Sequence, residues 1–173
     1  MKTFKRILLL VCISLSVLAC KKDDEGGDDP AGGTGSFTAQ VDGQSFEGIS
    51  GTVVAQVSAS GNGEAIAISG GTNASENLQM IIQNFTGEGT YELSFLNIGT
   101  YSYLPDPSNP DPNTVVVYST VGDAQTINGE LNVSSYDGNT VKGTFSFTGI
   151  NLNDPADTVS VTNGQFNIEV TQN

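Results

Sequence analysis

The chain has 173 residues, enough for one domain with a packed core but short for two. Its 21 glycines, 37% hydrophobic residues and lack of tryptophan are typical of a β-rich secreted domain, and its formal net charge is −13. Histidine is absent and the two cysteines, Cys12 and Cys20, lie near the N-terminus. Ser-His-Asp catalysis is therefore excluded, and the chain after Cys20 has neither a thiol nucleophile nor a His- or Cys-based zinc site.

The few basic residues are concentrated before residue 23. From Ser36 onward Lys142 is the only basic residue, against fourteen acidic side chains. Nucleic-acid binding needs clustered Lys and Arg to neutralise phosphates, so we predict no nucleic-acid partner. The same acidic surface repels anionic lipid headgroups, so we expect contact with a membrane only through an anchor.

Residues 1–19 have the layout of a secretory signal, with a basic start and an apolar run over residues 7–19. At ~1.5 Å per residue this run is shorter than a hydrocarbon core of ~30 Å, so we expect a removed signal rather than a transmembrane helix. Its end, "VLAC", resembles a bacterial lipoprotein lipobox. That resemblance implies cleavage before Cys20 and attachment of lipid, including palmitate, to Cys20. Ordinary cleavage after Ala19, with Cys20 incidental, is the alternative.

Residues 20–35 combine this cysteine with an acidic, glycine-rich stretch that has no hydrophobic periodicity. We predict a disordered tether. Its first residues resemble the surface-export signal of Bacteroidota-type lipoproteins, in which a lysine precedes acidic residues; here these are Lys22, Asp23, Asp24 and Glu25. This resemblance implies an outer-membrane protein on the cell surface. The alternative is a generic charged linker, which would not indicate on which face of the outer membrane the domain lies.

From Ser36 to the C-terminus, apolar and polar residues alternate with a period of two, which predicts strands buried on one face. The predicted strands cover residues 36–41, 52–59, 64–69, 77–83, 90–95, 114–119, 127–133, 143–150 and 164–170. In each predicted strand the alternation places the apolar residues in the core. Ala59, Phe95, Val115, Val117 and Ile127 are among these predicted core residues.

Turn residues separate the predicted strands. Asp-Gly pairs in 41–44 and 136–139 predict tight hairpins, and 60–64 predicts a longer hairpin loop. Asn-Gly pairs in 127–130 and 162–165 predict either a turn or a glycine bulge within a strand. We therefore predict an all-β fold for a single domain over residues 36–173. The expected architecture is an antiparallel β-sandwich of about eight to ten strands, with a closed or partly open β-barrel as the alternative.

The last third of the chain contains "YD", then "VKGTFSF", then "TNGQF". This series resembles an uncharacterised domain family of Bacteroidota lipoproteins, and "GTYEL" at 89–93 fits it as well. The matching residues are Gly129, Tyr136, Asp137, Val141, Gly143, Thr144, Phe145, Phe147, Thr162, Asn163, Gly164 and Phe166. The resemblance implies a secreted, lipid-anchored β domain of unknown function and carries over no site. Physically, Gly143 suits a bulge or a close backbone approach, and Phe145 with Phe147 directs two rings into one core.

The longest irregular stretch, residues 104–113, contains four of the six prolines and predicts a stiff exposed loop. We predict a ligand-binding surface here, formed by Tyr101 and Tyr103 beside the loop and Asp106 and Asp111 within it. Neither this stretch nor 151–157 has the spacing of a calcium loop. We therefore expect no metal site and no cofactor, with Ca²⁺ on these loops as the alternative.

These features together predict a non-enzymatic module that is displayed on the cell surface and binds or supports an extracellular glycan or protein. Two alternatives stay open. A carboxylate-based hydrolase, such as a glycosidase, needs only paired Asp or Glu side chains, although no motif selects a pair. A structural accessory subunit of an outer-membrane complex would expose an apolar patch. The sequence does not indicate an oligomeric state.

Overall fold

The computed structural model describes residues 33–61, 63–121 and 126–172. The predicted signal, the lipidation at Cys20 and the export signal at 22–25 lie outside this range. Strands dominate the described chain, together with a short 3₁₀ helix, η1 (Pro112–Thr114). The strands are β1 (Ser36–Val41), β2 (Gln44–Glu47), β3 (Val54–Ser60), β4 (Gly63–Gly71), β5 (Glu76–Phe85), β6 (Gly89–Leu93), β7 (Ile98–Tyr103), β8 (Val116–Ser119), β9 (Gly129–Tyr136), β10 (Thr140–Asn151) and β11 (Thr158–Gln172).

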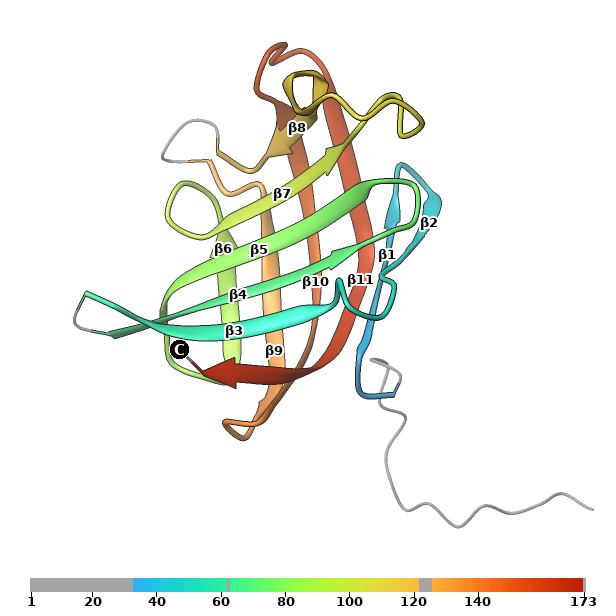
Figure 1. Ribbon diagram of the computed structural model, residues 1–173. Helices are drawn as coiled ribbons and strands as arrows, with labels where there is room; N and C mark the ends of the chain where they lie inside the picture. Colours follow the sequence, from blue (N-terminus) through green and yellow to red (C-terminus); the bar gives the residue numbers. More distant parts are fainter. Residues whose placement is uncertain (1–32, 62, 122–125, 173) are drawn as a thin grey trace, which may run out of the picture.

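The strands form one hydrogen-bonded sheet that folds into two layers (Figure 1). One layer has the order β3-β4-β5-β7-β8 and the other has the order β2-β1-β11-β10-β9-β6. In Figure 1 the strands of the first layer cross those of the second at a steep angle, an orthogonal packing of two sheets. The layers are joined where the end of β11 pairs with β3 and where the end of β10 pairs with β8.

The predicted all-β sandwich is confirmed, with two differences in detail. The described chain has eleven strands rather than eight to ten, because β2 and β7 were not predicted. The pairing of β11 with β3 is parallel, whereas every other strand pair is antiparallel. No described helix is long and apolar enough to cross a membrane.

The predicted hairpins all occur. The turn between β1 and β2 has positive φ at both Asp42 (47°) and Gly43 (79°), as a type I′ turn requires. Two backbone N–H groups donate to the Asp137 carboxylate in the turn between β9 and β10, which lowers the pKa of Asp137. The Asn-Gly pair at 163–164 lies within continuous β11, where Asn163 has a φ of 52° and the pairing with β10 shifts. It is a bulge rather than a turn.

Several predicted core positions are wrong. Phe95 and Ile127 are 55% and 56% exposed, because β6 ends at Leu93 and β9 begins only at Gly129. Beyond the ends of a strand the backbone is no longer extended, so alternating residues no longer point to opposite faces of the sheet. Ala59 is also exposed, at the outer end of β3.

The alternation of β8 is displaced by one residue from the prediction. Val116 and Tyr118 pack against the core, and not Val115 and Val117. The 3₁₀ helix η1 precedes this strand, and β8 begins only at Val116, two residues after the predicted start.

Two Gly-x-Phe triplets, 143–145 and 164–166, face each other across β10 and β11. The register pairs Gly143 with Phe166 and Phe145 with Gly164, so that each phenylalanine is opposite the glycine of the other triplet. A Cβ atom added at Gly164 would lie 2.6 Å from the ring of Phe145, and one added at Gly143 would lie 2.6 Å from Cζ of Phe166. Both rings therefore lie against bare backbone.

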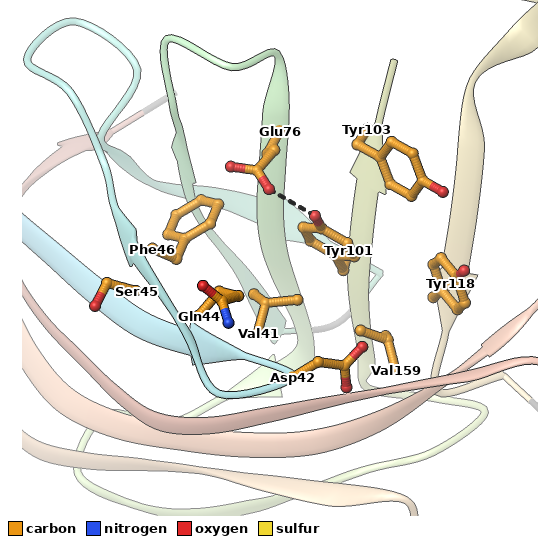
Figure 2. A pocket seen from close by; sticks show the side chains of 10 residues that line it. All are labelled: Val41, Asp42, Gln44, Ser45, Phe46, Glu76, Tyr101, Tyr103, Tyr118 and Val159. Atoms are coloured by element: carbon orange, nitrogen blue, oxygen red, sulfur yellow. Dashed lines mark hydrogen bonds between the residues drawn. The ribbon is translucent and has the colours of Figure 1, made fainter. Parts of the chain in front are cut away.

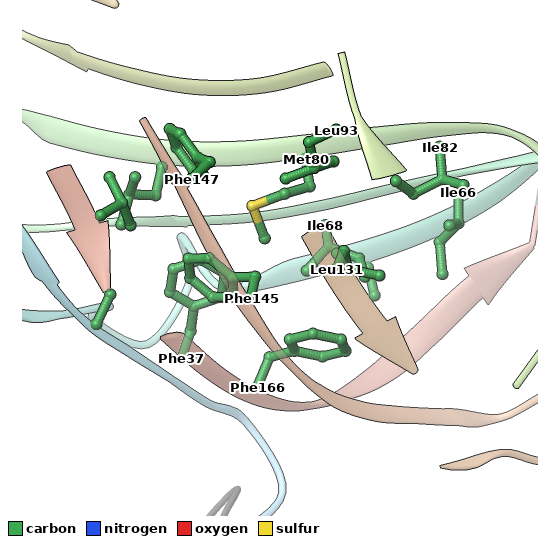
Figure 3. Packing of buried hydrophobic residues seen from close by; sticks show 14 of the residues in the cluster. Phe37, Ile66, Ile68, Met80, Ile82, Leu93, Leu131, Phe145, Phe147 and Phe166 are labelled. Atoms are coloured by element: carbon green, nitrogen blue, oxygen red, sulfur yellow. The ribbon is translucent and has the colours of Figure 1, made fainter. Parts of the chain in front are cut away.

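The same packing continues into the other layer. Phe37 of β1 contacts Phe145, with ring centroids 5.2 Å apart, and Phe145 contacts Phe166 at 6.4 Å (Figure 3). The ring of Phe37 in turn covers Gly70 of β4, where an added Cβ would lie 2.6 Å from the ring. One buried cluster consequently joins both layers.

Gly143→Ala should destabilise the fold by about 1–3 kcal/mol or more, because the new methyl group meets both the carbonyl of Asn132 and the Phe166 ring. Urea denaturation measures the free energy of unfolding. Gly63→Ala is the matched control, since a Cβ there meets only Asn84 Oδ1 at 3.6 Å. Equal unfolding midpoints for the two variants would contradict this account of the core.

Candidate ligand-binding pocket

A pocket of about 260 Å³ lies at one end of the two layers, between the β1–β2 hairpin and strands β5, β7 and β8 (Figure 2). It is open to solvent on one side. Its lining combines four aromatic rings with polar and acidic side chains: Val41, Asp42, Gln44, Ser45, Phe46, Glu76, Tyr101, Tyr103, Tyr118 and Val159.

Three tyrosines form one wall of the pocket. Tyr101 and Tyr103 are two residues apart on β7 and therefore face the same side, and Tyr101 is paired directly with Tyr118 of β8. The ring centroid of Tyr101 lies 5.9 Å from that of Tyr103 and 6.1 Å from that of Tyr118. The planes are inclined by 34° and 33°. Tyr101 and Tyr118 are buried and Tyr103 is half-buried, so Tyr103 is the most exposed of the three rings.

The carboxylate of Glu76 is held at the edge of this wall. Tyr101 donates its hydroxyl to Glu76 Oε1 at 2.8 Å, and Thr72 donates its hydroxyl to Oε2 at 2.9 Å (Figure 2 draws the first bond). Burial, followed by this bond to Glu76, raises the pKa of Tyr101 well above its usual value. The hydroxyl therefore stays protonated and continues to donate at neutral pH.

Tyr118 is likewise held by a hydrogen bond to a carboxylate, that of Asp157. Its hydroxyl donates to Asp157 Oδ2 at 2.9 Å, and the Asn151 side chain donates to the same oxygen at 2.8 Å. Burial and the bond to Asp157 raise the pKa of Tyr118 to about 12. The donors Asn151 and Tyr118 lower the pKa of Asp157, so this pair keeps its proton on the tyrosine.

Asp42 lies across the pocket from these tyrosines, in the β1–β2 turn (Figure 2). Its Oδ1 accepts a hydrogen bond from the backbone N–H of Ser160 at 2.8 Å, and its own N–H donates to the Ser160 carbonyl at 2.8 Å. These two bonds fasten the hairpin to β11. They fix the carboxylate at the pocket.

The structure brings together only part of the predicted binding surface. Tyr101 and Tyr103 line the pocket, whereas Asp106 and Asp111 do not. The Asp106 carboxylate accepts from the N–H of Ser108, and Asp111 accepts from the N–H and side chain of Asn113, where it caps η1. Their side chains stabilise turns of their own loop.

No cluster of three or more acidic, cysteine or histidine residues that could hold a metal ion occurs within residues 33–61, 63–121 and 126–172. In the second candidate calcium stretch, Asp157 bonds Tyr118 and Asn151, and Asp154 accepts from the N–H of Ala156. The absence of a metal and of a cofactor stays a prediction, with Ca²⁺ as its alternative.

Sequence reasoning missed Tyr118, Glu76, Asp42 and Phe46. Tyr118 was within reach, since the correct phase of its strand would have turned it inward beside Tyr101. The other three come from distant elements that meet only in the folded chain, and no local pattern marks them.

The pocket presents aromatic faces, hydrogen-bond acceptors and negative charge, and none of its lining residues is basic. Such a lining can contact the apolar parts of a ligand, accept its hydrogen bonds and attract positive charge. A general acid at neutral pH needs a carboxyl group with a raised pKa, whereas the pKa of Asp157 is lowered. Both oxygens of Glu76 already accept hydrogen bonds from neighbouring hydroxyls.

Comparison with known families gives one match. Residues 33–168 match a family described as a domain of unknown function (DUF6252). No curated protein and no solved structure matches the chain.

The raised pKa values of Tyr101 and Tyr118 predict alkaline instability. Unfolded tyrosines ionise near pH 10, so between about pH 10 and 12 the unfolded chain loses protons that the folded chain keeps. The free energy of unfolding should therefore be intact below pH 10 and fall as the pH rises above it. Changing both Tyr101 and Tyr118 to Phe should make the free energy of unfolding fall less steeply with pH. Tyr136→Phe is the control, because it removes a phenol outside the pocket. Denaturant titrations at several pH values measure this dependence. An equal dependence on pH for the two variants would contradict the assignment of the alkaline instability to Tyr101 and Tyr118.

Proposed function

The chain belongs to the DUF6252 family of domains of unknown function, and from this premise we propose that it is a lipid-anchored, non-enzymatic module of the cell surface. It binds an extracellular partner through the pocket lined by Tyr101, Tyr103 and Tyr118. The pocket supports the binding function, and residues 1–35 support the anchor.

The preorganised aromatic wall carries the binding proposal. Two of its three rings are fixed at the hydroxyl by carboxylates, Tyr101 by Glu76 and Tyr118 by Asp157. Rings that are already fixed lose little conformational freedom when a ligand binds, so more of the contact energy appears as affinity. Tyrosine also presents a large apolar face with a polar tip, which is why it is frequent in binding surfaces.

The hydrolase alternative is less well supported. A glycosidase places two carboxyl groups on either side of the bond that it cleaves, and one of them acts as an acid with a raised pKa. Of the carboxylates in and beside the pocket, Glu76 accepts from Tyr101 and Thr72, Asp42 accepts from the N–H of Ser160, and Asp157 has a lowered pKa. These groups support a role in positioning tyrosines.

The anchor proposal rests on the sequence before the domain. A secretory signal over 1–19 and the lipobox ending in Cys20 support lipidation, and Lys22 with the acidic residues 23–25 supports export to the outer face of the outer membrane. Fifteen residues separate Cys20 from Ser36, where β1 begins. Such a tether spans roughly 20 Å as a coil and about 50 Å when extended, which holds the domain clear of the bilayer.

One observation favours the second candidate, an accessory subunit of an outer-membrane complex. Phe95, Leu96 and Ile127 are 55%, 68% and 56% exposed. They lie on two loops that are joined by the hydrogen bond from the N–H of Asn128 to the Leu93 carbonyl, 2.9 Å. Large apolar side chains gathered at one end of a domain are typical of protein contacts.

The anchor is tested in cells. Cys20→Ala should move the protein from the membrane fraction to the soluble fraction, because without the thioether-linked lipid the acidic domain has no attachment. Cys12→Ala is the matched control and should leave the protein in the membrane. Changing Asp23, Asp24 and Glu25 together to alanine should reduce its cleavage by added protease on intact cells. Membrane retention of Cys20→Ala would refute lipidation, and unchanged cleavage would make residues 21–25 a plain linker.

The pocket is tested by titrating the full chain with a panel of simple sugars and small organic amines while recording NMR amide shifts. At least one compound should shift the amides around Tyr101, Tyr103 and Tyr118, and Tyr103→Ala should abolish the effect. Asp111→Ala is the control, since the structure places Asp111 in its own turn outside the pocket. If no compound of either class shifts these amides, the binding function of the pocket is wrong.

A further inference from the structure

We propose that the pocket lined by Tyr101, Tyr103, Tyr118, Glu76 and Asp42 recognises an organic cation, such as a substituted ammonium group. This inference rests on the proposed binding function and specifies the class of ligand. It is carried by the charge of the lining, the state of the tyrosine rings and the size of the cavity.

The side chains that line the pocket carry negative charge, and none of these described residues is basic. Glu76 and Asp42 line it, and Asp157 lies directly behind Tyr118, at the other end of a 2.9 Å hydrogen bond. Lys142, the single basic residue from Ser36 onward, is not among the lining residues. A concave site with charge of one sign concentrates counter-ions, so this pocket attracts cations and repels carboxylates and phosphates.

The tyrosine rings strengthen that attraction. A cation is drawn to the electron-rich face of an aromatic ring within about 6 Å of its centroid. Tyr101 and Tyr118 each donate a hydroxyl to a carboxylate, which polarises the phenol and increases the electron density of the ring. Tyr101 and Tyr118 are 7% and 8% exposed and Tyr103 is half-buried, so a small cation meets mainly the ring of Tyr103, whose centroid lies 5.9 Å from that of Tyr101.

The acceptors have capacity for a donor as well. A carboxylate offers about four lone-pair positions. The hydroxyls of Tyr101 and Thr72 take one at each oxygen of Glu76, and the N–H of Ser160 takes one at Asp42. A primary, secondary or tertiary ammonium group can therefore donate an N–H to either carboxylate while its alkyl groups contact the rings, whereas a quaternary ammonium group is held by the Coulombic attraction of the same carboxylates.

The size of the cavity limits the ligand to a small group. At about 260 Å³ it is below the ~300–1,000 Å³ that is usual for drug-sized ligands. A compact ammonium group, free or at the end of a larger molecule, fits this volume. Its open side leaves room for the remainder of such a molecule outside the pocket.

The decisive experiment compares choline with 3,3-dimethyl-1-butanol, its uncharged carbon analogue of the same shape. The chain has no tryptophan, so tyrosine emission from the full chain reports binding directly. At constant ionic strength choline should bind at least about ten-fold more tightly than the alcohol, because only choline gains the cation–π and carboxylate attraction. Raising the sodium chloride concentration should weaken choline binding further.

Glu76→Gln separates charge from shape. Its amide oxygen still accepts from Tyr101, so the ring stays in place while one negative charge is lost. Choline affinity should fall several-fold and the affinity of the alcohol should not change. Glu92→Gln removes the same charge from an exposed position on β6 and should leave both affinities as they are.

The outcomes distinguish the two proposals. Equal affinity for choline and the alcohol, or shifts caused by sugars and not by amines, would overturn the cation inference and leave the binding pocket intact. If neither choline, the alcohol nor any sugar binds, the pocket is not a ligand site and both proposals fail. An equal effect of Glu76→Gln and Glu92→Gln would show general screening rather than recognition, and would also overturn the inference.

Discussion

The reciprocal contact between the two Gly-x-Phe triplets of β10 and β11 is the constraint on which the rest of the domain depends. Each ring needs the space that only glycine leaves on the partner strand, so Gly143 pairs with Phe166 and Phe145 with Gly164 in one register. A slip of β11 by one residue against β10 would turn Phe166 to the other face and away from Gly143. Because β11 also pairs with β1 and β3, this register positions the strands of both layers.

The bulge at Asn163 divides β11 into two parts with different tasks. The part after the bulge carries Phe166 and continues to β3, whereas the part before it borders the pocket through Val159. The two backbone bonds between Ser160 and Asp42 then secure the β1–β2 turn at this end. The pocket is thus built on strands that the core already fixes, which is a favourable basis for a preorganised site.

The acidic side chains in and beside the pocket accept hydrogen bonds from neutral donors: Glu76 and Asp157 from tyrosine hydroxyls, and Asp42 from the N–H of Ser160. The bond between Tyr118 and Asp157 illustrates this: it favours the protonated tyrosine and the ionised aspartate together, so the pKa values move in opposite directions. Such bonds orient the rings without neutralising the charge. An acidic domain with a single lysine can therefore keep carboxylates beside an aromatic wall, and the negative charge remains available to a ligand.

The sequence by itself determined the all-β class, most strands and three of the hairpins, β1–β2, β3–β4 and β9–β10, because period-two alternation and glycine-containing turns are local signals. It also indicated Tyr101 and Tyr103, because they stand beside the proline-rich loop; that both lie on one face of β7 is seen only in the structure. Tertiary structure alone decided the crossing of the two layers, the parallel pairing of β11 with β3, and the meeting of the tyrosines with Glu76 and Asp42. These features depend on contacts between residues far apart in the chain. No local pattern encodes such contacts, since the same alternation fits many strand orders.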